Sequence, residues 1–165
     1  MCGGEGTRLA ADAEKPLFEV GGRPMLGRVL DALDGAAVDA VHAVTSPATP
    51  DTLAYLDDRD ATVIEGRGEG YVADLPLLAP AVVDDALAAY DGRNVTVCVP
   101  TRLKESLGVS TETVRDEGGE QLSPTGLNVV AADDAGERVE RVWDARAAVN
   151  VNYADDAATA EVLAG

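Results

Sequence analysis

The sequence predicts one α/β domain, residues 1–165, with helices packed on a mostly parallel central sheet. Its 165 residues suit a single domain built around one core. Hydrophobic residues make up 46% of the chain, which excludes a disordered tail. Short β-branched runs alternate with segments of helical periodicity, as they do when crossover helices connect parallel strands.

The N-terminal half contains three predicted strands and two predicted helices. The strand at 17–20 is stopped by Gly21-Gly22, and Pro24 then opens a helix with apolar residues at helical spacing. A buried strand runs into the turn Thr45-Ser46-Pro47, and the next helix is expected to have Asp51 or Thr52 near its cap. These elements are the strands 17–20, 40–44 and 61–64 and the helices 24–33 and 51–58.

The C-terminal half continues the alternation with one exception. The segment 105–123 is polar, contains glycine and has no period, so we expect a loop that either covers a substrate or lacks structure. Ligands of such folds bind over the carboxyl ends of the strands. The remaining predicted elements are helices at 82–90 and 155–163 and strands at 94–99, 127–131, 139–143 and 149–151.

The composition of the chain limits the binding partners and the cellular compartment that we expect. Thirteen basic and thirty acidic residues give a net charge of −17, which repels nucleic acid and anionic membranes. Only Lys15 and Lys104 are lysines, and this acidic, lysine-poor style resembles that of extreme halophiles. Two cysteines exclude a disulfide framework. Without an apolar run of membrane length or a signal peptide, we expect a cytoplasmic protein. The sequence leaves a homodimer open.

The strongest motif is a glycine-rich loop near the N-terminus. Gly3, Gly4 and Gly6 allow a tight turn whose bare N–H groups could hold phosphate oxygens. Arg8 and Lys15 would add positive charge. The alternative is an ordinary glycine turn with solvated cations. Neither the kinase-type phosphate loop nor the dinucleotide fingerprint fits these residues.

This motif resembles the signature of the nucleoside-triphosphate transferase superfamily, in Gly3-Gly4-Glu5-Gly6-Thr7-Arg8 followed by Glu14-Lys15-Pro16-Leu17. Within it, four further segments resemble archaeal GTP:adenosylcobinamide-phosphate guanylyltransferases. These segments are 45–50, 68–75, 124–130 and 150–152.

The resemblance implies a Rossmann-like three-layer nucleotidyltransferase fold and a reaction of GTP with adenosylcobinamide phosphate. That reaction yields adenosylcobinamide-GDP and pyrophosphate, in cobalamin biosynthesis. Arg8 and Lys15 would stabilise the leaving pyrophosphate. Mg²⁺ would be held by Asp74, Asn150 and Asn152, and the acceptor by Gly126 and Asn128. The implied nucleotide-binding residues are Gly3, Gly4, Glu5, Gly6, Thr7, Arg8, Lys15, Thr45, Ser46, Gly68 and Gly70.

The chain also departs from the family pattern. The family has two Asp-Leu pairs, whereas this chain has the single Ala73-Asp74-Leu75-Pro76, so we expect one helix and one core strand to be missing there. We also expect the first strand to be nearly absent. Asp74 could instead be a solvated helix-cap carboxylate. The alternatives are a molybdenum-cofactor or sugar-phosphate nucleotidyltransferase and a degenerate, non-catalytic nucleotide-binding protein.

Overall fold

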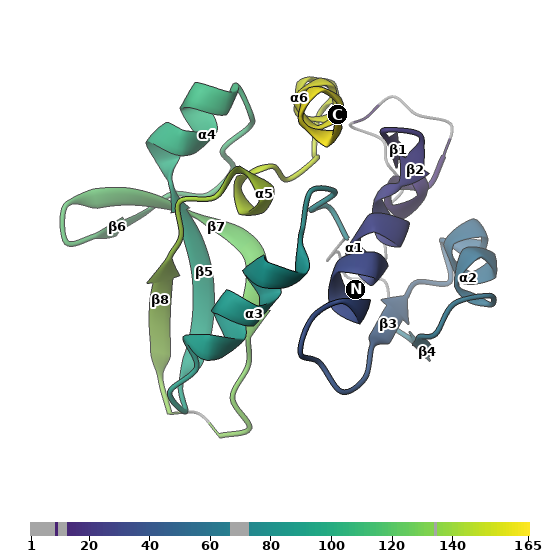
Figure 1. Ribbon diagram of the computed structural model, residues 1–165, viewed down its shortest axis with the longest axis horizontal. Coiled ribbons are helices and arrows are strands. Elements are labelled where there is room, and N and C mark those ends of the chain that lie inside the picture. Colours follow the sequence, from purple (N-terminus) through teal and green to yellow (C-terminus); the bar gives the residue numbers. More distant parts are fainter. Residues whose placement is uncertain (1–8, 10–12, 67–72, 134) are drawn as a thin grey trace.

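The computed structural model describes residue 9 and residues 13–66, 73–133 and 135–165. It confirms the α/β class (Figure 1). None of the helices in these ranges combines the length and apolarity needed to cross a membrane. The helical elements are η2 (Lys15–Leu17), α1 (Met25–Asp34), α2 (Pro50–Leu56), α3 (Pro80–Ala88), α4 (Thr101–Leu107), α5 (Ala145–Ala148) and α6 (Ala154–Ala164). The strands are β1 (Glu19–Val20), β2 (Arg23–Pro24), β3 (His42–Thr45), β4 (Thr62–Glu65), β5 (Asn94–Pro100), β6 (Arg115–Glu117), β7 (Glu120–Val129) and β8 (Glu137–Arg141).

The largest sheet has the strand order β6-β7-β5-β8 and is mixed. β5 pairs in parallel with β8 and antiparallel with β7. Because β5 is interior, apolar side chains are buried on both of its faces: Val95, Val97 and Val99 lie on one face and Cys98 on the other, and all are fully inaccessible. Such a nearly continuous apolar run is what an interior strand requires. The strand predicted at 94–99 from its β-branched residues is therefore confirmed as β5.

The second sheet contains only β3 and β4, which pair in parallel from His42 and Thr62 to Thr45 and Glu65. A cluster of Leu26, Ala43 and Leu56 packs α1 and α2 against it. Within the described residues, the expected continuous sheet is thus divided into a two-stranded parallel part and a four-stranded mixed part. β1 and β2 form a separate antiparallel pair.

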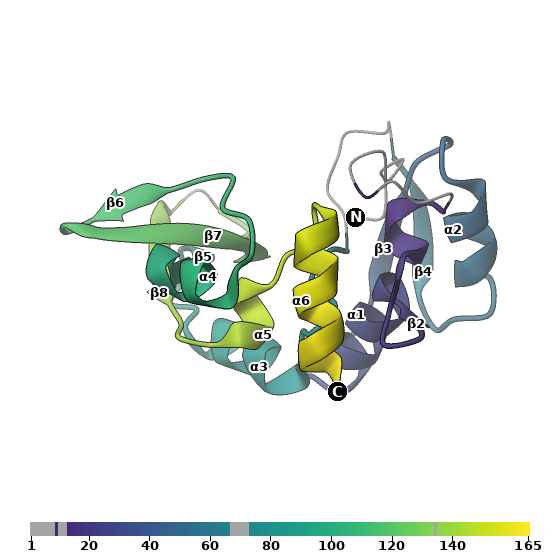
Figure 2. The ribbon, with the colours of Figure 1, turned by 90° about the horizontal axis from the view of Figure 1, so that it is seen from above.

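Helix α6 lies between these two parts (Figure 2). Its Ala157 and Ala160 join a buried cluster with residues that come from distant points in the chain. Small residues on α6 allow its backbone to approach closely, and α1 also contacts α3 directly. Helices rather than strand pairing therefore connect the two sheets. The other buried members of the cluster are Leu9, Val20, Met25, Val109, Val149 and Val151.

Two predictions for the C-terminal half are wrong. The segment 105–123 is ordered: α4 ends at Gly108 in the left-handed conformation, and a hairpin of β6 and β7 follows. Gly118 and Gly119, both at positive φ, make its turn. The residues 149–151 are buried but form no strand, because the Val151 N–H donates to the Asp74 carbonyl instead of to a ladder.

We predict that Val97→Ala will lower the free energy of unfolding by about 1–3 kcal/mol, because it empties a fully buried position of β5. Val162→Ala is the matched control, since Val162 is 80% exposed on α6. Urea denaturation measures both. Equal effects of the two substitutions would contradict the interior position of β5.

Candidate functional site

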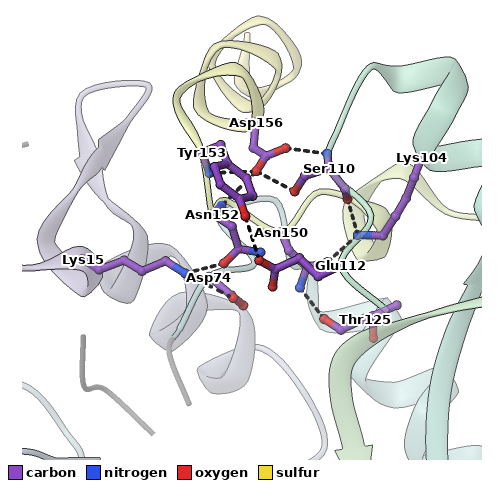
Figure 3. A network of polar contacts seen from close by, with 10 residues as sticks. All are labelled: Lys15, Asp74, Lys104, Ser110, Glu112, Thr125, Asn150, Asn152, Tyr153 and Asp156. Carbon is purple, nitrogen blue, oxygen red and sulfur yellow. Dashed lines mark hydrogen bonds and ion pairs between the residues drawn. The ribbon is translucent and has the colours of Figure 1, made fainter. Parts of the chain in front are cut away.

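Residues from four separate segments meet where α6 begins, between the two sheets (Figure 3). The segments are η2, the residues before α3, the end of α4 and the residues 150–153. Of the predicted site residues, Lys15, Asp74, Asn150 and Asn152 are brought together here. The predicted residues that lie outside the described residues are Gly3, Gly4, Glu5, Gly6, Thr7, Arg8, Gly68 and Gly70.

Lys15 is the central cation of this site. Its Nζ donates to the Asn152 Oδ1 at 2.6 Å and lies 3.6 Å from the Asp74 Oδ2. Pro16 sets the φ angle that η2 needs, and Glu14 fixes the chain just before it. The Glu14 carboxylate accepts from the N–H groups of Asp51 and Thr52 and so caps α2. The backbone on both sides of Lys15 is therefore held in place.

Asp74 is a largely enclosed carboxylate, with a side chain 21% exposed. Burial raises the pKa of Asp74 above its ordinary value of 3.8, because a charged carboxylate loses hydration there. The Lys15 charge and a hydrogen bond from the Asn150 side chain partly oppose this rise in the pKa. The Asp74 carbonyl accepts from the Val151 N–H at 2.9 Å, which ties this segment to the residues before α6.

Asn150 is a buried junction between the two lysines. Its Oδ1 accepts from the Lys104 Nζ at 3.0 Å, and its Nδ2 donates to the Thr125 carbonyl. Gly126 is adjacent: a Cβ built on it would lie 3.7 Å from the Asn150 Nδ2. Asn128 is exposed and bonds back to the Gly126 carbonyl. Gly126 thus borders the site, and the Asn128 side chain is engaged locally.

Asp156 holds the backbone of the site in place. This buried carboxylate accepts from the N–H groups of Asn152 and Tyr153 at 3.0 and 2.9 Å. It also accepts from the N–H and hydroxyl of Ser110 at 2.6 and 2.8 Å. Four donors compensate the lost hydration of the anion. Asp156 therefore joins the residues after α4 to the N-terminus of α6.

Thr45 and Ser46 are in the two-stranded sheet. Thr45 is buried at the end of β3, and its carbonyl accepts from the Gly66 N–H at 2.8 Å. The Ser46 Oγ accepts from the Ala48 N–H, which makes a local turn. Among the described residues, no hydrogen bond joins either side chain to Lys15 or Asp74. Their predicted contact with the nucleotide stays a prediction.

Sequence reasoning missed Lys104, Asp156, Ser110 and the capping role of Glu14. One signal was available, because Lys104 is the second of only two lysines and both lie at this site. Among the described residues, no group of three His, Cys, Asp or Glu side chains gathers as a metal cage. Mg²⁺ seldom needs such a cage, since it is commonly held by one or two carboxylates plus substrate phosphates.

The N-terminal part of the chain matches a known protein family. Residues 1–72 match the family described as MobA-like NTP transferase domain. A solved nucleotidyl transferase from Methanothermobacter thermautotroptrophicus is similar in fold, with a TM-score of 0.59 over 94% of this chain and 90% of that one at 17% identity. The fold is thus similar to that of a nucleotidyltransferase, and the family match supports the class that the glycine motif predicted.

Within that class, one curated relative spans nearly the whole chain. The chain is 29% identical to the adenosylcobinamide-phosphate guanylyltransferase of Methanocaldococcus jannaschii, over 99% of this chain and 94% of the relative. The bifunctional protein GlmU of Corynebacterium jeikeium is 30% identical over 59% of this chain but only 26% of its own length. The resemblance to archaeal adenosylcobinamide-phosphate guanylyltransferases is therefore confirmed.

The alignment with the archaeal relative runs over 191 positions, whereas this chain has 165 residues. At least 26 positions of the relative therefore have no counterpart in this chain. That length is enough for a helix, a strand and their connections, because an average helix has about 11 residues and an average strand about 5. The expected loss of one helix and one core strand before Asp74 stays a prediction.

We predict that Asp74→Asn will change how stability depends on pH. Because folding raises the pKa of Asp74, the folded state binds the proton more tightly, and this group costs more stability as the pH rises above 3.8. The free energy of unfolding of Asp74→Asn relative to wild type should therefore increase as the pH rises and then level off. Chemical denaturation between pH 3 and 7 measures it.

Asp91→Asn is a control of opposite sign. Arg93 lowers the pKa of Asp91 to about 2, so the Asp91 charge stabilises the fold above its ordinary pKa. Asp91→Asn should therefore be less stable than wild type at neutral pH. A parallel pH profile for the two variants would contradict the assigned environment of Asp74.

Proposed function

We propose that this protein transfers GMP from GTP to adenosylcobinamide phosphate and releases pyrophosphate. The observation that carries the proposal is the similarity to the archaeal guanylyltransferase over almost the full length of both chains. The meeting of Lys15, Asp74 and Asn152 at one point supports it, because nucleotidyl transfer needs a cation and a carboxylate beside the phosphates.

In this reaction an oxygen of the acceptor phosphate attacks the α-phosphorus of GTP. The new P–O bond forms as the bond between the α-phosphorus and the bridging oxygen to the β-phosphate breaks, and pyrophosphate leaves with that electron pair. The protein positions the two phosphates and balances their charge. The Lys15 ammonium would bind phosphate oxygens on this route, exchanging its present oxygen partners for them. Arg8 and the glycines of the loop would hold the triphosphate.

Asp74 and Asn152 are the residues that would hold Mg²⁺. The donor set fits, because a carboxylate and an amide oxygen are hard oxygen ligands and leave room for phosphate oxygens and water. A neighbouring cation would also stabilise the charge of the largely enclosed Asp74 carboxylate, because burial disfavours that charge. The ion would supply charge neutralisation at the phosphate oxygens. Asn150 suits this role less well, since its oxygen already accepts from Lys104.

A second candidate function is nucleotide binding without transfer. The division of the sheet within the described residues and the shorter chain favour it. A different acceptor is the third alternative, because part of the chain also matches sugar-nucleotide enzymes. A comparison of GTP with ATP, CTP and UTP as substrates tests the third alternative, since a non-guanine preference favours a sugar-type acceptor.

The decisive experiment incubates the protein in concentrated KCl with GTP, Mg²⁺ and adenosylcobinamide phosphate. We expect pyrophosphate release and a product with the mass of adenosylcobinamide-GDP. Lys15→Met should lower kcat/KM by about 100-fold or more, the usual effect of removing one donor to a charged transition state. Arg59→Met is the control, because Arg59 stacks on Tyr55 at the surface. Binding of GTP by the folded protein without turnover would favour the second candidate and overturn the first.

A further inference from the structure

A cavity lies at the C-terminal end of α6, whereas the candidate site lies at the N-terminal end of this helix. Figure 2 shows the C-terminal end of α6 between α1 on one side and α3 and α5 on the other. The cavity has a volume of about 490 Å³, which is within the range of small-molecule sites. Because α6 has 11 residues, its two ends are about 16 Å apart. The cavity is therefore separate from the residues around Lys15.

The charged residues of the cavity wall are mostly basic. Arg23, Arg28 and Arg146 line it, and the one acidic residue that the structure places in the wall is Asp31. The whole chain has the opposite balance, with 13 basic and 30 acidic residues. Two of the arginines are matched by a carboxylate, since Arg23 pairs with Asp31 and Arg146 with Asp144. The remaining positive charge makes the cavity attractive to an anion.

Arg28 supplies that unmatched charge. Its side chain is half-buried, and no carboxylate of the described residues lies within ion-pair distance of it. The Arg28 Nε donates to the Val20 carbonyl at 2.7 Å, and this is its one hydrogen bond to the described part of the chain. A guanidinium has five N–H donors, so the two Nη groups keep donors for a ligand. A bound anion would offset the cost of holding this cation partly out of water.

The surroundings of Arg28 fix the position of its guanidinium. Gly21 has a φ of +59°, and a Cβ added there would lie 2.5 Å from the Arg28 Nη2 and 3.3 Å from the Ala164 Cβ. A side chain at residue 21 would therefore push the guanidinium away from the end of α6. The glycine and the Val20 carbonyl together hold the cation in place, and a group fixed in this way loses little entropy when it binds a ligand.

Other parts of the cavity wall are apolar. Leu77 and Leu78 come from the segment between Asp74 and α3, and Leu163 comes from the last turn of α6. Leu163 is 45% exposed, and the other two leucines are half-buried. A ligand that covers these side chains removes apolar surface from water, which favours binding. The cavity therefore matches a molecule with an anionic group at one end and an apolar body.

We propose that this cavity binds a small organic anion, whose carboxylate or phosphate group pairs with Arg28 and whose apolar part contacts Leu77 and Leu163. Both anionic groups suit a guanidinium, since each offers two oxygens to its paired N–H groups. The inference goes beyond the proposed function, because the cavity contains none of the residues assigned to nucleotidyl transfer. Its test therefore needs no transfer activity.

Four probes test the charge and the apolar body separately: hexanoate, hexyl phosphate, hexanol and inorganic phosphate, each added at constant ionic strength. Binding is followed by the leucine methyl signals in carbon-13 NMR spectra, with those of Leu77 and Leu163 assigned from methionine variants. We expect hexanoate or hexyl phosphate to shift both sets of signals, and the tighter of the two identifies the anionic group.

Hexanol lacks the charge and inorganic phosphate lacks the apolar body, so each should bind more weakly by about tenfold or more. Equal affinity for hexanol and hexanoate would overturn the proposal, and so would equal affinity for inorganic phosphate and hexyl phosphate. Leu77 and Leu163 signals that neither organic anion shifts would also overturn it.

Leu163→Glu tests the site without altering Arg28, and Val162→Glu is the matched control. Both substitutions add one negative charge to the last turn of α6 at an exposed position, but Leu163 lines the cavity and Val162 does not. Leu163→Glu should weaken binding of hexanoate by about tenfold or more, because it adds a like charge and removes an apolar contact. Val162→Glu should weaken it by no more than about twofold. Equal effects would contradict the location of the site.

Arg28→Met removes the group that would bind the anion, and Arg59→Met is its control, because Arg59 stacks on Tyr55 elsewhere on the surface. We expect the affinity for hexanoate to fall by about 10- to 100-fold in Arg28→Met, as the loss of a hydrogen bond between charged groups predicts, and to stay unchanged in Arg59→Met. Arg28→Gln keeps N–H donors without the charge and serves if the methionine variant does not fold. Unchanged affinity in a folded Arg28 variant would overturn the proposal.

Discussion

The contact of Lys15 with Asp74 and Asn152 is the interaction on which the candidate site depends. It joins residues up to 137 positions apart in the sequence. Each partner enters it from a different part of the fold, and each is fixed by backbone bonds nearby, such as that from Val151 to the Asp74 carbonyl. An isolated buried carboxylate would be costly, whereas one beside a cation and an amide N–H is tolerated. The fold therefore balances the charges of the site before any substrate binds.

Helices and strands with periodic buried apolar residues were predictable from the sequence, whereas elements held by polar contacts were not. The helix that contains Met25 and the strand that contains Val97 were found because their apolar residues follow the expected periods. The hairpin of β6 and β7 was missed because ion pairs hold much of its surface. Arg115 pairs with Glu137, whose pKa it lowers to about 2, and Arg141 pairs with Glu120. Such a strand shows no apolar alternation.

A similar distinction explains which residues of the site were predictable from the sequence. Lys15 and Asp74 were predictable from motifs, because their neighbours in sequence form a recognisable pattern. Lys104 and Asp156 belong to no motif, and they act through contacts that only the folded chain creates. Scarcity was the one available sign, since a chain with two lysines and a charge of −17 places both at one point. The amide orientation of Asn150 depends on partners from α4 and β7, so no local pattern specifies it.

A divided sheet changes what must keep the site rigid. In a continuous α/β sheet, strand pairing fixes the loops at the carboxyl ends relative to one another. Here, within the described residues, β3 and β7 belong to different sheets, and helices α1 and α6 bridge the parts. Packed helices can slide slightly past one another, whereas hydrogen bonds fix the direction between two groups. The Asp156 carboxylate accepts from the N–H groups of Ser110 and Asn152, and Lys15 donates to the Asn152 side chain. These bonds lie at the joint, so the polar contacts take over a positioning task that strand pairing performs in a continuous sheet.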